Sequence, residues 1–146
     1  MQKTAAAPVV FAGHKEDYMA FEPPRPWRIV VTDDDPVLMA LLVGTLRDDG
    51  HCVFAAYDGE SACELALLIP DLDLLITNTR WGTVTNRELI RLVRNKKPGL
   101  PILHIGDPMP NPDGFLDDVP ALRHPFTADQ LLEKVRELVT HQWGRA

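Results

Sequence analysis

The sequence has few cysteines and no long apolar run, and each shortage excludes a class of protein. Only two of its 146 residues are cysteine, Cys52 and Cys63, and they have neither a CxxC pair nor the Cys/His spacing of a zinc site. Two free thiols are typical of the reducing cytoplasm. No apolar run approaches the length of a membrane span. We therefore expect a cytoplasmic protein that holds no structural zinc and does not cross a membrane.

Positive charge is also in short supply. The chain has 15 Lys and Arg against 21 Asp and Glu, a formal net charge of −6, and no basic stripe. Nucleic acids and anionic membranes attract proteins through basic patches, so we expect neither among the partners. The remaining composition, with 45% apolar and 25% charged residues, is typical of a globular protein. The length suits one domain with its own core.

Residues 1–27 differ from the rest of the chain. They mix Ala, charged residues and a terminal proline cluster, and show neither helical nor strand periodicity. We predict an extended or disordered arm, followed by a folded domain at 28–140 and a short tail at 141–146. The Pro-rich end could also dock a groove that binds polyproline helices. The apolar stretch at 5–13 is short, interrupted by Pro8 and followed by charges, which disfavours a secretion signal.

From residue 28 onward, strand-like and helix-like patterns alternate. Asp35 and Pro36 suit the N-cap and first position of a helix, and Gly50 suits its end. Capping boxes at Thr85 and Thr127 open two later helices. Such alternation indicates an α/β domain whose parallel sheet carries helices on both faces. The predicted strands are 28–32, 52–56, 72–77, 102–105 and 121–122, and the predicted helices are 36–49, 60–68, 85–97 and 127–139.

Polar residues and a glycine lie at the carboxyl ends of four of these predicted strands. Asp33 and Asp34 follow the first strand, Asn78 ends the third, Gly106 follows the fourth and His124 follows the fifth. Because the carboxyl ends of parallel strands meet at one edge of a sheet, we expect these residues to gather in one cleft. Two adjacent carboxylates there suit a divalent cation with oxygen ligands, above all Mg²⁺.

Four segments of the sequence resemble the receiver domain of bacterial two-component response regulators: RIVVTDDDPVLMALLVGTLRDDGHCVFAAYDGESACELA, PDLDLLITN, LPILHIG and HPFTADQLLEKVRELV. The resemblance covers Arg28 to about Val139 and is most specific in its first half. It implies a flavodoxin-like, doubly wound sheet of five parallel strands in the order 2-1-3-4-5. The stretch GDPMPNPDGFLDDVP is shorter and richer in proline than the family's equivalent. We therefore expect the fourth helix to be short or missing.

The resemblance also assigns roles at the strand ends. Asn78 falls where the family has the aspartate that accepts a phosphoryl group. Asp33 and Asp34 match the acidic pair that holds Mg²⁺, and the backbone carbonyl of Arg80 matches the third protein ligand. A carboxamide is a far poorer nucleophile than a carboxylate and removes one anionic ligand, so we expect no phosphorylation and weak Mg²⁺ binding at most. Alternatively, Asp33 caps the turn into the helix while Asp34 pairs with Arg80 or His124.

Three further positions of the family's phosphorylation switch are changed. Gly106 replaces the hydroxyl residue that hydrogen-bonds the phosphoryl group, Ala121 replaces the aromatic switch residue, and His124 replaces the lysine. All the changes point to a pseudo-receiver, which has lost the switch. Beside carboxylates, His124 would titrate near neutral pH, or it is simply solvated.

We therefore expect a stand-alone, non-enzymatic pseudo-receiver that acts by protein contacts in two-component or phosphorelay signalling. Its partner would be a sensor histidine kinase, a phosphotransfer protein or another regulator. The helix segment VLMALLV at 37–43 is apolar all round, so one side of it either meets such a partner or is covered by the N-terminal arm.

Two other functions stay open at this point. The first is a working phosphorelay receiver, or a decoy that binds the kinase without accepting phosphate. The second is a phosphatase-like enzyme, because Asp71 and Asp73 form a DxD pattern. That motif needs a strand before its first aspartate, whereas here the strand follows it.

Overall fold

The computed structural model describes residues 26–79 and 84–144, so residues 1–25 of the predicted arm and Arg80 lie outside the described residues. Five parallel strands form one sheet in the order β2-β1-β3-β4-β5, which confirms the predicted topology. The strands are β1 (Arg28–Asp33), β2 (Cys52–Ala56), β3 (Leu74–Asn78), β4 (Ile102–Ile105) and β5 (Ala121–Leu122), and the helices are α2 (Pro36–Asp48), α3 (Gly59–Leu68), α4 (Asn86–Lys96) and α5 (Ala128–Gly144).

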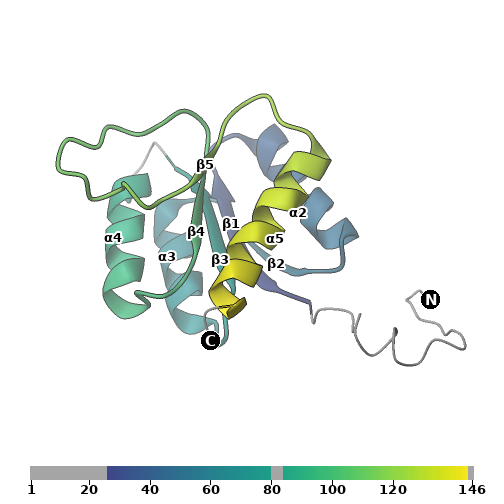
Figure 1. The fold of residues 1–146 in the computed structure, drawn as a ribbon, viewed down its shortest axis with the longest axis horizontal. Helices are drawn as coiled ribbons and strands as arrows, with labels where there is room; N and C mark the ends of the chain where they lie inside the picture. The colour runs from purple at the N-terminus through teal and green to yellow at the C-terminus, as the bar shows by residue number, and fades with distance from the viewer. Residues whose placement is uncertain (1–25, 80–83, 145–146) are drawn as a thin grey trace, which may run out of the picture.

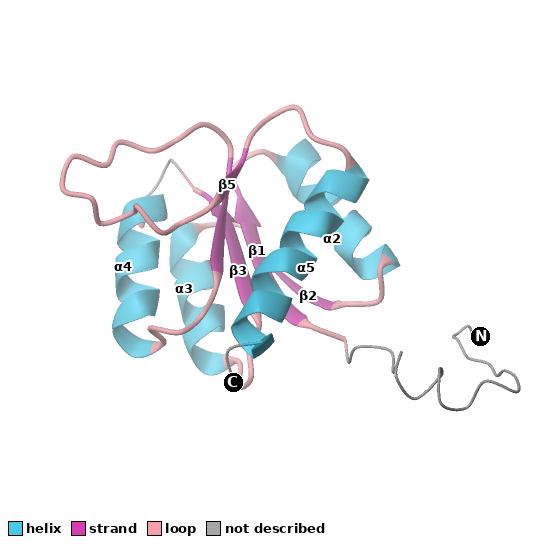
Figure 2. Cartoon of the chain, in the orientation of Figure 1, coloured by secondary structure: helices cyan, strands magenta, loops and turns pink. Residues whose placement is uncertain are grey.

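Helices cover both faces of the sheet, as the alternating pattern predicts. Figures 1 and 2 show α2 and α5 on one face and α3 and α4 on the other. Side chains of β1 alternate between the two cores: Ile29 and Val31 pack with α2 and α5, whereas Val30 packs with α3 and α4. This double burial is why β1 reads as a continuous apolar run. No helix in the described part of the chain is long and apolar enough to cross a membrane.

The ends of α2 and α5 follow the predicted chemistry. Asp35 caps α2, because its side chain accepts a hydrogen bond from the backbone N–H of Val37 at 2.9 Å. Gly50 follows α2 with φ +94°, a left-handed conformation that favours glycine. At α5, Thr127 and Gln130 exchange side-chain-to-backbone bonds of 2.8 and 3.1 Å, which confirms the capping box.

The capping box predicted at the start of α4 is wrong. Thr85 is the N-cap residue, but its side chain makes no capping hydrogen bond. Glu88 instead accepts two hydrogen bonds from Arg91, at 3.0 and 2.5 Å, one turn further along the helix. The two residues are exposed and oppositely charged, and this local pairing takes the carboxylate away from the helix start.

Both predicted domain boundaries shift. Trp27, assigned to the arm, is only 5% exposed and belongs to the core between the sheet, α2 and α5. Its ring stacks on His51 with centroids 4.6 Å apart. The core of the domain therefore includes Trp27. At the other end, α5 continues to Gly144, so most of the predicted tail is helical backbone.

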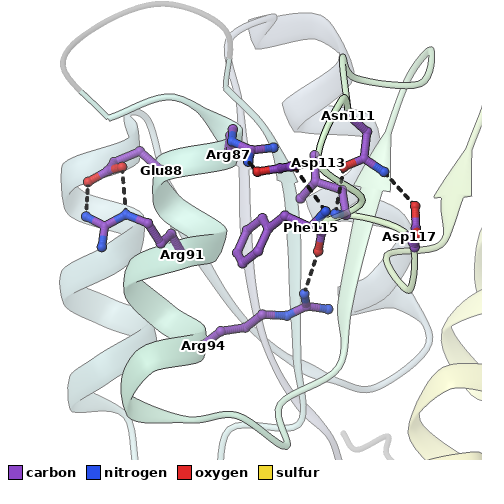
Figure 3. Close-up of polar contacts among 9 residues, drawn as sticks. Arg87, Glu88, Arg91, Arg94, Asn111, Asp113, Phe115 and Asp117 are labelled. Atoms are coloured by element: carbon purple, nitrogen blue, oxygen red, sulfur yellow. Dashed lines mark hydrogen bonds and ion pairs between the residues drawn. The ribbon is translucent and has the colours of Figure 1, made fainter.

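The connection between β4 and β5, residues 106–120, contains no α-helix, as expected from its prolines. It lies against α4 (Figure 3), where Arg87 pairs with Asp113 and Arg94 donates to the backbone carbonyl of Phe115 at 3.3 Å. The guanidinium groups of both arginines lie over the Phe115 ring, 5.1 and 5.7 Å from its centroid. The segment that replaces the helix is thus attached to α4 by specific contacts.

Candidate functional site

Asp33 and Asn78 meet at the carboxyl edge of the sheet. They end the adjacent strands β1 and β3 and are direct partners in the parallel register. The Asn78 Nδ2 atom donates a hydrogen bond of 3.2 Å to Asp33 Oδ2, and the backbone N–H of Asp35 donates one of 2.8 Å to Asp33 Oδ1. Both oxygens of the Asp33 carboxylate therefore have protein donors. The structure brings together the first aspartate of the predicted pair and the predicted acceptor position.

Burial governs the charge of this pair. Asp33 is 2% exposed and Asn78 6%. Burial raises the pKa of Asp33 above its ordinary value, and the charges of Asp35 and Asp34 raise it further. The hydrogen bonds from the Asp35 backbone and the Asn78 carboxamide partly offset this rise. Ionised Asp33 is therefore a source of instability in the folded domain.

Replacing Asp33 with asparagine is expected to stabilise the domain at neutral pH by about 1 kcal/mol, because a buried carboxylate is removed and an acceptor for the Asp35 N–H remains. A flip of the Asn78 carboxamide turns its oxygen toward the new amide N–H and keeps the second hydrogen bond. A raised pKa in the folded state means that the wild type loses stability as pH rises above the ordinary value of 3.8. The advantage of the variant should thus grow from pH 4 to 8 in urea unfolding. Asp107→Asn, at a side chain 88% exposed, is the control and should change little. A destabilised Asp33→Asn at pH 8 would contradict the assignment.

The other predicted site residues lie at different distances from this pair. Asp34 is half-buried, and its backbone N–H donates to the Asn78 carbonyl at 3.3 Å. Gly106 faces Asn78, because a Cβ there would lie 3.8 Å from both carboxamide atoms. Ala121 is half-buried and pairs with β4. His124 is exposed, and its ring stacks on Phe126 with centroids 5.5 Å apart. The described contacts therefore do not join His124 to Asp33.

The pair fits a divalent cation poorly. Among the described side chains, those of residues 26–79 and 84–140, no group of three His, Cys, Asp or Glu could hold a metal ion. The Asn78 carboxamide presents its N–H to Asp33, on the side where a cation would need an oxygen. Mg²⁺ at Asp33 would compete with that donor for the same oxygen.

Four functional candidates escaped the sequence analysis. Thr77, Thr79, Asn86 and His104 form a buried hydrogen-bonded network beneath Asn78. From its sequence spacing, His104 could be only a surface or a core residue, and nothing in the sequence singles out Asn86. The two residues lie in separate elements, so no spacing motif joins them. The available clue was a histidine inside a four-residue strand that is otherwise apolar.

Sequence comparisons find similar regulatory proteins. No protein-family model matches the chain. The transcriptional regulatory protein TcrA of Mycobacterium tuberculosis is 29% identical over 117 residues, which are 76% of this chain and 45% of that protein. The nitrogen assimilation regulatory protein NtrX of Azorhizobium caulinodans is 28% identical over 53% of this chain and 17% of its own length. The chain thus spans less than half the length of these curated relatives.

Solved structures extend the likeness across the whole fold. A response regulator receiver protein from Sinorhizobium medicae is 27% identical, with a TM-score of 0.71, over 80% of this chain and 97% of that one. The receiver domain of a sensor histidine kinase from Pseudomonas aeruginosa, with magnesium in its active-site cleft, has a TM-score of 0.66 over 79% of this chain and 98% of its own. Its 18% identity supports the fold alone. Sheet order, strand-end geometry and these comparisons show that the domain has the fold of a receiver domain and is similar to response-regulator receiver proteins of two-component systems.

Proposed function

We propose that this receiver works without phosphorylation of residue 78 and acts through protein contacts in two-component or phosphorelay signalling. The observation that carries the proposal is the hydrogen bond from Asn78 Nδ2 to Asp33 Oδ2. A carboxamide supplies that donor, whereas an ionised carboxylate has none. A carboxamide also lacks the electron density to attack phosphorus. The chemistry of residue 78 thus favours a static polar contact over group transfer.

A metal ion has a minor role in this proposal. Magnesium occupies the cleft of the Pseudomonas aeruginosa receiver domain. In this chain we propose weak binding at most, through Asp33, Asp34 and the backbone carbonyl of Arg80. The bound ion would supply positive charge beside Asp33, where burial now raises the carboxyl pKa.

The proposed contact surface is the outer side of α2. Val37 and Leu41 are 78% and 48% exposed, although a helix on a sheet usually carries polar residues there. The segment between Pro36 and Leu46 contains no charged residue. Such a surface suits an apolar partner surface on a sensor histidine kinase, a phosphotransfer protein or another regulator.

Phosphoryl transfer gives the decisive test. The purified chain is incubated with acetyl phosphate and Mg²⁺, and its intact mass is measured. We expect no phosphoryl adduct, because residue 78 offers no carboxylate. Asn78→Asp, treated in the same way, is the positive control for a reacting mixture. An acid-stable or acid-labile adduct on the unchanged chain would instead favour the working phosphorelay receiver.

A further inference from the structure

The network beneath Asn78 is almost completely buried. Asn86 and His104 are each 3% exposed, and Thr77 and Thr79 are fully buried. They come from the end of β3, the first residue of α4 and the third residue of β4. The contact between Asp33 and Asn78 uses none of them. Buried polar groups of this kind are stable only when their donors and acceptors are matched.

The orientation of the Asn86 side chain follows from its partners. Its Oδ1 accepts hydrogen bonds from the hydroxyls of Thr77 at 2.7 Å and Thr79 at 3.0 Å, and from the backbone N–H of Thr79. A backbone N–H can only donate, so Oδ1 must point toward β3. Nδ2 then points toward His104.

The His104 ring links this carboxamide to the chain beyond β4. Its Nδ1 lies 3.0 Å from Asn86 Nδ2, which is a donor, so Nδ1 accepts. Its Nε2 therefore carries the proton and donates to the backbone carbonyl of Asp107 at 2.7 Å. One unbroken series of hydrogen bonds thus joins β3, the start of α4, β4 and residue 107.

The same connection is attached to α4 further along. Arg94 donates to Asp118 at 2.8 Å and to the Phe115 carbonyl at 3.3 Å, and Arg87 pairs with Asp113. Figure 3 shows these arginines reaching from α4 to the connection. The first residues of the segment 106–120 are therefore held on β4 and, through Asn86, at the start of α4, whereas its later part is held directly on α4.

We propose that Asn86 and His104 form a permanent clamp, which holds the β4–β5 connection against α4 in one conformation. The inference rests on the proposed function. In the family that the sequence resembles, a hydroxyl after strand four links that strand to a phosphoryl group on strand three. Gly106 has no hydroxyl here, and His104, two residues earlier in β4, links β4 to β3 through Asn86 instead.

Amide hydrogen exchange on the full chain tests the clamp. His104→Gln keeps a donor near the Asp107 carbonyl and loses the acceptor for Asn86. We expect its amides at Gly106, Leu116 and Val119 to exchange about tenfold faster, relative to those of β1, because one buried hydrogen bond is lost. Thr77→Val is the matched control, since it also removes one hydrogen bond from the network but leaves the link to β4 intact.

A second histidine variant covers the case in which the first does not fold. His104→Asn keeps an acceptor for Asn86 and loses the donor to Asp107, so the same selective acceleration is expected. Unchanged relative exchange at residues 106–119 in the folded histidine variants would overturn the clamp, as would equal acceleration in Thr77→Val. A phosphoryl adduct on the unchanged chain would instead overturn the proposed function. Hydrogen exchange does not detect that adduct, so failure of the clamp and failure of the proposed function give different results.

Discussion

Asn78→Asp is expected to lower the free energy of unfolding by roughly 2–4 kcal/mol at neutral pH without divalent cations. The Asn78 Nδ2 atom lies 3.2 Å from Asp33 Oδ2, so the variant places a second carboxylate against a buried first one. The pKa of Asp33 is already raised by burial, and a neighbouring like charge raises it further. The loss should shrink as pH falls toward 4, because protonation of either carboxylate ends the repulsion.

Magnesium should restore part of this stability. Asp33, Asp34 and the carboxylate introduced at position 78 would supply the cluster of anionic oxygens that the described residues of the wild type lack. Binding to the folded state alone would return about 2–3 kcal/mol at 100-fold excess over the dissociation constant. Urea unfolding in EDTA and in MgCl₂ measures both effects. Asn78→Ala, which removes the hydrogen bond without adding charge, should lose less stability and should not respond to Mg²⁺.

An Asn78→Asp variant as stable as the wild type in EDTA would contradict the geometry. It would mean that residue 78 and Asp33 do not face each other within hydrogen-bond distance. A variant that loses stability but ignores Mg²⁺ would show instead that Asp34 and the adjoining backbone do not complete a cation site.

Local sequence signals predicted most helices and strands of this fold. The features that they failed to predict depend on contacts with residues outside the local motif. Asp35, Gly50 and Thr127 act within one turn of their helix, so their roles could be predicted from sequence spacing. Thr85 failed because Arg91, a competitor for Glu88, lies one turn beyond the motif. The strand patterns and the family resemblance together gave the correct sheet order.

The sequence predicted the part of the candidate site in which the pairing of two strands is enough to bring two side chains together. Asp33 and Asn78 are register partners, so knowing which strands are neighbours suffices to bring them together. His124 follows a strand of only two residues, and its ring stacks on Phe126 outside the site. The pairing of Asn86 with His104 depends on how α4 sits over β4, which no spacing in the sequence encodes.

Gly59→Ala is expected to destabilise the domain by roughly 1–3 kcal/mol, the usual cost of overpacking. Gly59 is the first residue of α3, one residue before the predicted helix start, and is buried against the connection between β3 and α4. A Cβ added at Gly59 would lie 2.0 Å from the backbone oxygen of Val84 and 2.9 Å from its carbonyl carbon. Backbone atoms cannot rotate away as a flexible side chain would, so α3 or the connection must shift.

The same substitution at Gly44 should have the opposite effect. Gly44 lies inside α2, and a Cβ there meets nothing within 4 Å. Alanine is a better helix former than glycine by about 1 kcal/mol, so Gly44→Ala should raise the midpoint of urea unfolding while Gly59→Ala lowers it. Helix propensity alone predicts the same sign for both variants. Opposite signs would therefore show that close approach of α3 to the Val84 backbone, and not helix propensity, decides the effect at position 59, whereas stabilisation of both would refute that contact.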